Sequence, residues 1–320
     1  MIEDGWVLAL WGGGFGLLVG SFLNVVIHRL PLMEYRSWLE GIALNLVPEH
    51  DPDAPASAPR EPGLWQLVFG EGRATPEVVT RAAQEAKSGL AALPRLNLMV
   101  PRSRCPQCGH AIRWYENVPV LSWLALRGRC SSCGTGISVR YPLVELVTGA
   151  LFAWCVWRWG GSVTALAWCG FAAVLVSLTL IDWDTTLLPD NLTLPLVWAG
   201  LMVAALGWIH VPLADAVWGA VGGYLSLWLV YQVFKLLTGK EGMGYGDFKL
   251  FAALGAWFGW QALVPIVLMA SGIGAVVGLV MKLRGGLRAG GVVPFGPFLA
   301  MGGVTAMVFG PQSILRAVGL

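Results

Sequence analysis

Two aspartates of this 320-residue chain stand directly against apolar stretches, where a lone carboxylate is costly. Asp182 follows the apolar run 162–181, and Asp247 lies immediately before the apolar run 248–261. An ionisable side chain in such a place usually serves a function, because taking its charge out of water destabilises the protein. Two carboxylates that meet at one membrane face could hydrolyse a peptide bond, with one accepting a proton from the attacking water and the other donating to the carbonyl oxygen. Like charges in close approach push the two pKa values apart, so the pair titrates as one unit and keeps one proton near neutral pH.

The residues around the two aspartates form two polar islands in the apolar chain. We expect five of them to support the catalytic loops: Asp184, Asp190, Gly244, Gly246 and Lys249. For Asp184 and Asp190 a plain structural role competes on equal terms, because polar residues mark span ends and Asp190 could cap the next helix. For Asp247 that interpretation is weaker, since the flanking glycines free the backbone in a way that a simple cap does not need.

Four cysteines form a second constellation, in two Cys-x-x-Cys pairs separated by 21 residues: Cys105, Cys108, Cys130 and Cys133. This spacing is typical of a closed tetrahedral Zn²⁺ site with four thiolate ligands. Such a site is structural, because it leaves no open position for water. Two disulfides or a set of redox-active thiols are the alternative, which a reducing compartment disfavours. His110 is close enough to compete as a ligand, but the sequence favours a bystander role for it.

The composition indicates a membrane protein. Hydrophobic residues make up 56% of the chain and charged residues 12%, whereas a soluble domain carries about 25% charged residues. Since about 20 residues cross a hydrocarbon core, the apolar runs predict an all-α polytopic membrane protein with about eight transmembrane helices that contact lipid. Gly12, Gly16 and Gly20 are spaced four apart, which is typical of close packing between such helices. The expected spans are 6–27, 142–158, 162–181, 191–210, 213–237, 248–261, 263–281 and 294–311.

The basic residues predict the orientation of these spans. If the first span exits to the cytoplasm, 19 of the 21 Lys and Arg residues lie on the cytoplasmic side, and only Arg158 and Arg316 lie outside. Cytoplasmic segments carry an excess of Lys and Arg. Many of the 19 lie in one long loop, where basic residues are weaker evidence of orientation, but those near span ends support the same orientation. Both Asp182 and Asp247 then emerge on the cytoplasmic side, as their joint chemistry requires.

The span boundaries divide the chain into three parts. Residues 1–28 are expected to form the first transmembrane helix, 29–141 a cytoplasmic domain with its zinc-binding segment at 101–141, and 142–320 a transmembrane catalytic domain. Within the second part, residues 32–74 are rich in Pro, Glu, Asp and Ala with few apolar clusters, which is typical of loosely ordered chain.

Five blocks of the sequence, taken in order, resemble the type IV prepilin peptidase family, whose members are membrane aspartyl proteases of the Gly-x-Gly-Asp type. The blocks are residues 20–31, the tetracysteine segment from 101 to 146, the island that begins at Ile181, the stretch 240–249 around Asp247, and the Pro-Phe-Gly-Pro of 294–297. One such motif would be weak evidence, whereas five in this order are highly specific. The stretch 32–94 holds no motif of the family, and no catalytic residue depends on it.

The resemblance implies a role for each matching residue. The first catalytic aspartate of the family lies seven residues before the proline of a Leu-Pro-Asp element, here Pro189, which selects Asp182 over Asp184. The second is the aspartate of Gly-x-Gly-Asp, which is Asp247. The implied substrates are prepilins and type II secretion pseudopilins, cut on the cytoplasmic face of the bacterial inner membrane after a short basic leader that ends in glycine.

The resemblance also implies a second activity. Family members with the tetracysteine segment are associated with N-methylation of the newly exposed residue, using S-adenosylmethionine. Gly242, Gly244 and Gly246 superficially resemble a nucleotide-binding loop, but no βαβ unit surrounds them. The methyl-donor site is therefore unknown from the sequence; Glu145, an acid inside a span, could contribute to it or serve only in packing and hydrogen bonding. No nucleic-acid partner is expected, and the oligomeric state stays open.

Two other functions stay open on the residues alone. A transporter could use the two acids to relay protons or ions, although the sequence shows no internal repeat and both acids lie toward one face. A methyltransferase without protease activity would transfer a methyl group to an already mature pilin, whether or not the two aspartates are intact.

Overall fold

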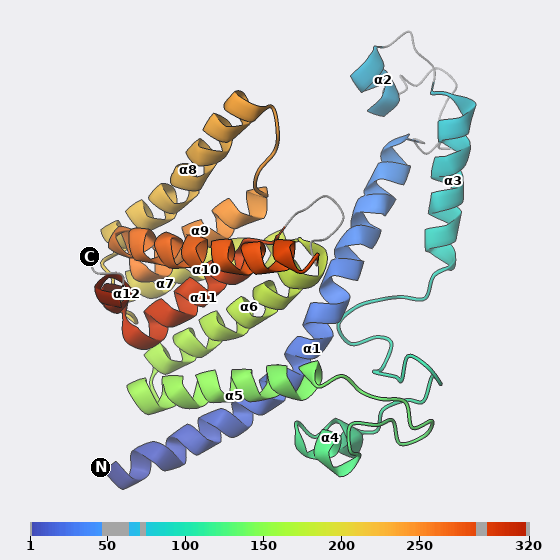
Figure 1. Ribbon diagram of the computed structural model, residues 1–320. Helices are drawn as coiled ribbons and strands as arrows, with labels where there is room; N and C mark the ends of the chain where they lie inside the picture. The colour runs from blue at the N-terminus through green and yellow to red at the C-terminus, as the bar shows by residue number, and fades with distance from the viewer. Residues whose placement is uncertain (1, 47–63, 71–74, 286–292, 318–320) are drawn as a thin grey trace. The chain divides into compact units, whose positions relative to one another are not determined.

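The computed structural model describes residues 2–46, 64–70, 75–285 and 293–317. Within these ranges the regular structure is helical, apart from two isolated β-bridges (Figure 1). The chain divides into two compact units, one of residues 29–102 and one that joins residues 1–28 to 103–320. The long helices are α1 (Ile2–Leu46), α3 (Glu77–Ala92), α5 (Arg140–Trp159), α6 (Val163–Thr185), α7 (Asp190–Ala205), α8 (Leu213–Thr238), α9 (Tyr245–Phe258), α10 (Leu263–Leu283) and α11 (Gly296–Phe309). The short ones are α2 (Leu64–Phe69), η1 (Trp114–Asn117), α4 (Leu121–Ala125), η2 (Trp260–Ala262) and α12 (Pro311–Ala317), where η marks a 3₁₀ helix.

Each expected span falls on a helix, namely α1 and then α5 to α11 in chain order. Among the described residues, four stretches are long and apolar enough to cross a membrane: Gly5–Leu46, Val163–Thr185, Leu213–Thr238 and Trp260–Leu283. α7 and α11 are apolar but shorter; the 14 residues of α11 rise by about 21 Å, less than a hydrocarbon core of roughly 30 Å. These helices make the chain a multi-pass membrane protein, and the number of spans stays a prediction.

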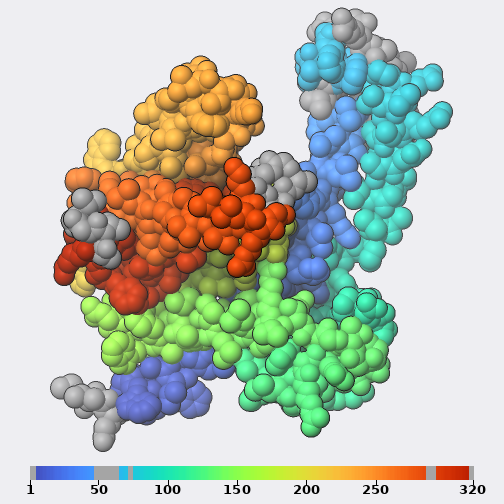
Figure 2. Space-filling model, in the orientation of Figure 1, coloured from blue at the N-terminus to red at the C-terminus, as the bar shows by residue number. Residues whose placement is uncertain are grey.

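The outer surface of the helical unit is apolar. Figure 2 shows α10 at the surface, and Val264, Val276 and Leu279 on this helix are mostly exposed. A soluble protein rarely exposes a continuous apolar face of this kind. Contact with lipid explains it without any further partner.

Two helix ends position the polar islands. α6 ends at Thr185, after which Thr186 adopts a left-handed φ of 56°, a conformation that is uncommon for a residue with a Cβ. α9 begins at Tyr245, directly after Gly244. Asp182 therefore lies in the last turn of α6, and Asp247 lies in the first turn of α9.

α9 is enclosed by its neighbours. Ten of its 14 residues are buried, and it packs against α7, α8 and α11. The approach of α8 to α9 depends on two glycines, because a Cβ on Gly219 would overlap the Gly255 carbonyl group. Close approach through small residues is the usual way in which membrane helices associate. The packing fixes the helix that carries Asp247.

The N-terminal part of α1 packs on α5 through glycines, as the four-residue spacing predicts. A Cβ on Gly16 would lie 2.7 Å from the Cβ of Phe152, and one on Gly20 would lie 2.7 Å from the Cα of Glu145. Asn24 then donates its side-chain amide to the Tyr141 carbonyl oxygen at 3.2 Å. The first turns of α5 are thus held against α1.

The unit of residues 29–102 is tied together by two arginines of α1. Arg29 donates to the carbonyl oxygens of Asn97 (2.9 Å) and Pro101 (2.6 Å). Arg36 donates to the Pro94 carbonyl oxygen at 3.1 Å. These bonds satisfy carbonyl groups of a stretch that has no regular structure of its own.

The expectation of loosely ordered chain over 32–74 is wrong for residues 32–46, where α1 continues without a break. That stretch contains Leu, Met, Glu, Arg and Ala, which favour helix, and it contains no proline. The composition of 32–74 as a whole concealed it, because the prolines and aspartates follow later in the stretch. α2 adds a further short helix, and residues 47–63 and 71–74 lie outside the described ranges.

Replacing Gly219 by alanine is expected to destabilise the α8–α9 contact, since the added methyl group would overlap the Gly255 carbonyl. Overpacking of this kind costs about 1–3 kcal/mol. Gly222→Ala is the matched control, because its methyl group would meet only a Leu263 methyl at 3.5 Å, and both variants gain the same helix propensity. Thermal unfolding in detergent should give a lower midpoint for G219A than for G222A. Equal midpoints would contradict the close approach.

Candidate active site and metal centre

Asp182 and Asp247 come together although they lie on different helices. Both are buried, with 4% and 7% of their surfaces exposed, and their carboxylates are close enough to repel each other. The two carboxylates, which lie far apart in the sequence, are therefore close together in space, as a catalytic pair requires.

Two glycines and a leucine make room for this approach. A Cβ on Gly296, the first residue of α11, would lie 2.6 Å from Asp182 Oδ2 and 3.1 Å from Leu188 Cδ1. A Cβ on Gly246 would lie 2.6 Å from Leu188 Cβ. The side chain of Leu188 thus fills the space between the two glycines, and larger residues at either position would push on Asp182 or on the loop before Asp247.

The two oxygens of Asp247 have different surroundings. Oδ2 accepts the Gly244 N–H at 3.2 Å, as an acid in the first turn of a helix commonly does. Oδ1 is buried and has no hydrogen-bond partner among the described residues. A buried polar atom left in this way is costly and calls for a functional explanation. One oxygen therefore caps α9, and the other is available to a reacting molecule.

Asp184 and Asp190 each bind a cation instead of joining the pair. Arg140 donates to both oxygens of Asp184, at 2.9 and 2.6 Å. Lys249 donates to both oxygens of Asp190, at 2.6 and 2.8 Å. Partly exposed ion pairs contribute only about 0–1 kcal/mol, so they matter more for position than for stability. The first links the start of α5 to the end of α6, and the second links the first turns of α7 and α9.

Sequence reasoning missed three residues of this site: Gly296, Leu188 and Arg140. Gly296 belongs to the Pro-Phe-Gly-Pro block, which stood out in the sequence only because it resembles a motif of the family. Nothing in its spacing showed that it would touch Asp182. Leu188 stood beside Pro189 as an ordinary apolar residue, and Arg140 counted only as a cytoplasmic charge.

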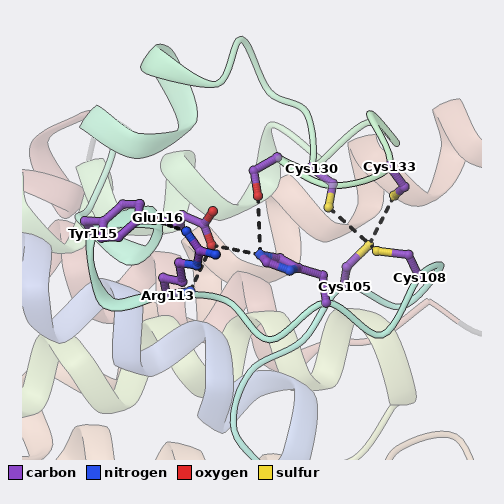
Figure 3. Close-up of polar contacts among 9 residues, drawn as sticks. Cys105, Cys108, Arg113, Tyr115, Glu116, Cys130 and Cys133 are labelled. Atoms are coloured by element: carbon purple, nitrogen blue, oxygen red, sulfur yellow. Dashed lines mark hydrogen bonds and ion pairs between the residues drawn. The ribbon is translucent and has the colours of Figure 1, made fainter.

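The four cysteine thiols of the predicted metal site converge (Figure 3). Their sulfur atoms all lie within 4.8 Å of one another, with Cys105 to Cys133 at 3.8 Å and Cys108 to Cys130 at 4.0 Å. Four sulfurs at Zn–S distances of about 2.3 Å in a tetrahedron would be separated by roughly 3.8 Å. None of the four forms a disulfide. The cluster fits a tetrahedral metal ion such as Zn²⁺.

The two Cys-x-x-Cys pairs have the same backbone structure. In the first, Cys105 N–H donates to the His110 carbonyl oxygen and Gly109 N–H to the Cys105 carbonyl oxygen. In the second, Cys130 N–H donates to the Thr135 carbonyl oxygen and Gly134 N–H to the Cys130 carbonyl oxygen. The two glycines have left-handed φ angles of 72° and 71°, which glycine adopts without strain.

Each turn presents its backbone N–H groups to a sulfur. Those of Cys108 and Gln107 lower the pKa of the Cys105 thiol, which favours the metal-binding thiolate. His110 does not face the sulfurs; its Nε2 lies 3.2 Å from Glu116 Oε2. The expectation that His110 is a bystander agrees with this geometry.

Glu145 fastens the cysteine segment to the helices. Its Oε2 accepts the Val120 N–H at 2.7 Å, and the Ser21 hydroxyl also bonds to it. Of the two roles that the sequence left open for Glu145, the structure supports packing and hydrogen bonding. This acid holds α1, α5 and the segment before α4 in one arrangement.

Comparison with known proteins gives a consistent result over nearly the whole chain. Residues 15–159 match the family described as bacterial peptidase A24 N-terminal domain, and residues 169–279 match the type IV leader peptidase family. The chain belongs to the type IV leader peptidase family. The stretch that matches the type IV leader peptidase family contains Asp182 and Asp247, and the stretch that matches the N-terminal domain contains the four cysteines.

Curated relatives of this leader peptidase family share one name, prepilin leader peptidase/N-methyltransferase. The protein of Burkholderia pseudomallei is 50% identical over 304 residues, covering 95% of this chain and 86% of the relative. That of Stutzerimonas stutzeri is 48% identical over 297 residues, covering 93% and 89%, and that of Pseudomonas aeruginosa is 44% identical over 304 residues, covering 93% and 89%. No solved structure matches the chain.

Zinc content tests whether the four cysteines hold a metal ion. The purified protein should hold about one Zn²⁺ per chain, and Cys105→Ser should lose most of it, because three thiolates bind the ion less tightly than four. Gln107→Ser lies within the same Cys-x-x-Cys turn but removes no thiolate, so it should keep the metal. Elemental analysis of the three proteins measures the outcome. Equal and substoichiometric zinc in all three would remove the proposal of a zinc site.

Proposed function

We propose that this chain is a prepilin leader peptidase/N-methyltransferase in which Asp182 and Asp247 hydrolyse the peptide bond. Membership of the leader peptidase family and the shared name of relatives up to 50% identical support the activity. The observation that carries the residue assignment is the convergence of two buried, mutually repelling carboxylates at the ends of α6 and α9. The other acids near them, Asp184 and Asp190, are bound by cations.

The pair acts through one shared proton. The ionised carboxyl takes a proton from water, the water oxygen attacks the carbonyl carbon, and the protonated carboxyl donates to the carbonyl oxygen. Collapse of this intermediate breaks the C–N bond: the leaving amine takes the proton that the first carboxyl removed from water, and the second carboxyl regains a proton from the hydroxyl group of the intermediate. Asp247 Oδ1, which is buried without a partner among the described residues, is one oxygen that could hold the water. Burial strengthens each of these electrostatic interactions.

The substrates are prepilins and type II secretion pseudopilins. The cut falls after the glycine that ends a short basic leader, on the cytoplasmic face of the bacterial inner membrane. The distribution of Lys and Arg supports this orientation, since it places both aspartates and the cysteine segment on the cytoplasmic side. The ion pairs Arg140–Asp184 and Lys249–Asp190 position the two catalytic helix ends.

The second activity acts on the product of the first. S-adenosylmethionine supplies the methyl group: the new N-terminal amine attacks the methyl carbon, the carbon–sulfur bond breaks with its electrons passing to sulfur, and the amine releases a proton to water. The relatives' name carries this assignment. The Zn²⁺ ion has a structural role, because four thiolates occupy every position of a tetrahedral site.

Asp182→Asn and Asp247→Asn should each abolish cleavage of a prepilin in membranes. An amide can neither accept the proton of water nor share one with its partner. Asp215→Asn is the control, because Asp215 lies in the first turn of α8, near Gly259 at the opposite end of α9 from Asp247. Gel separation of precursor and mature pilin measures the result. Cleavage at the normal rate by either Asn variant at the pair would exclude the mechanism.

Gly296→Ala should lower the cleavage rate by about tenfold or more, since a methyl group here would lie 2.6 Å from Asp182 Oδ2 and displace it. Gly272→Ala is the matched control, because no atom lies within 4 Å of the added Cβ. Initial rates on the same prepilin, with protein amounts equalised by blotting, give the comparison. If both variants cleave like the unmodified protein, Gly296 has no part in positioning Asp182.

A further inference from the structure

The cysteine segment contains a hollow that neither the metal cluster nor the aspartate pair uses. Its volume is about 590 Å³, within the range of roughly 300–1,000 Å³ that small-molecule sites occupy. Glu116, Arg113 and Tyr115 line it, and Figure 3 shows the polar contacts of these side chains. All of its lining residues come from the stretch between the first cysteine pair and the end of the second.

Glu116 provides a fixed negative charge in this hollow. Only 10% of its side chain is exposed, and its Oε2 accepts the Arg113 backbone N–H at 2.8 Å. That bond, together with hydrogen bonds from Ser131 and His110, lowers the pKa of Glu116 to about 2. The carboxylate is therefore held in place and stays ionised.

Arg113 provides a positive charge in the same hollow. Its guanidinium donates to the Tyr115 hydroxyl at 2.5 Å and lies 5.9 Å from the centroid of the Tyr115 ring. No ion pair joins Arg113 to Glu116 among the described residues, although their charges interact. The hollow thus presents a carboxylate, bonded through Oε2 to the Arg113 backbone and to His110, and a guanidinium bonded to the Tyr115 hydroxyl. Each can also contact a ligand group of opposite charge.

The remaining wall suits a flat or apolar group. Ala125 and Leu126 contribute an apolar patch, and His110 and Tyr115 contribute rings. Small-molecule sites commonly combine an apolar lining with a few polar groups that fix orientation. A ligand that carries both charges of an amino acid and also a planar base matches all of these features.

We propose that this hollow binds S-adenosylmethionine, with Arg113 facing the carboxylate of its methionine part and Glu116 facing its positively charged groups. The inference rests on the proposed N-methyltransferase activity and names its donor site. The hollow uses no residue of the aspartate pair, so donor binding and peptide cleavage are separable.

The attachment of the segment brings this site toward the peptide cut. Arg140, the first residue of α5, binds Asp184, which lies two residues after Asp182. Glu145, one and a half turns further along α5, holds Val120 of the cysteine segment. The start of α5 is thus linked both to the end of α6 and to the segment that holds the hollow.

Direct binding of the donor tests the proposal. Full-length, zinc-loaded protein in detergent is dialysed against radiolabelled S-adenosylmethionine, and the dissociation constant is measured for the unmodified protein and for Glu116→Gln and Arg113→Ala. Each variant removes a charged contact, so each should weaken binding by on the order of tenfold or more. Arg129→Ala, in the same segment but outside the hollow, is the matched control and should bind normally. Prepilin cleavage and zinc content should be unchanged in all of them.

The outcomes separate the possible failures. Normal donor affinity in both variants, in an enzyme that methylates, would overturn the proposed site and leave the proposed function intact. A raised KM for prepilin cleavage with unchanged donor affinity would show that the hollow binds peptide, and would also overturn it. If Glu116→Gln loses zinc, the donor affinity of Arg113→Ala alone tests the proposal, because Arg113 bonds to Glu116 through its backbone N–H and not through its side chain. An unmodified enzyme that cleaves but neither binds the donor nor methylates would refute the second activity and the site with it.

Discussion

The structure depends on bringing two carboxylates out of water and close to each other. Asp182 and Asp247 are both buried, and each would be ionised in water. Their repulsion and desolvation oppose folding, so other interactions must hold the two helix ends together. The packing of α9 against its neighbours provides these interactions.

Packing supplies most of the restraint. α9 is buried along most of its length, and the approach at Gly219 and Gly255 leaves it no room to shift against α8. The two ion pairs at Asp184 and Asp190 add little free energy because they are partly exposed. Their effect is geometric, since they link the ends of α6 and α9 to α5 and α7. A buried carboxylate pair held in place by close packing, with ion pairs at its edge, is the kind of positioning that the proposed reaction requires.

The cysteine segment cannot be stabilised by packing in the way that the helices are. Between residues 103 and 139 the described structure contains only short helices and isolated bridges, and only Cys105, Pro119 and Gly128 are buried. A segment of this size lacks the apolar area for stable folding, and a structural metal is a common substitute. The proposed metal ion at the four cysteines would also hold Glu116 and Arg113 in defined places within this small loop region. The carboxylate of Glu145 then attaches this independent piece to the membrane helices.

The sequence by itself determined the class of the protein and, except at the end of α1, the bounds of each apolar helix to within about five residues. It also singled out the two aspartates and the four cysteines as predicted site residues. These are local signals, since hydropathy depends on neighbouring residues and metal ligands repeat at short spacing. It misjudged residues 32–46, where averaging over a longer stretch concealed a helix. Only the tertiary structure decided that Gly296 touches Asp182, that Asp184 and Asp190 bind cations, and that Arg113 and Glu116 line one hollow. Such contacts join residues up to 114 positions apart, as between Asp182 and Gly296, and no local pattern encodes which of many buried surfaces will meet.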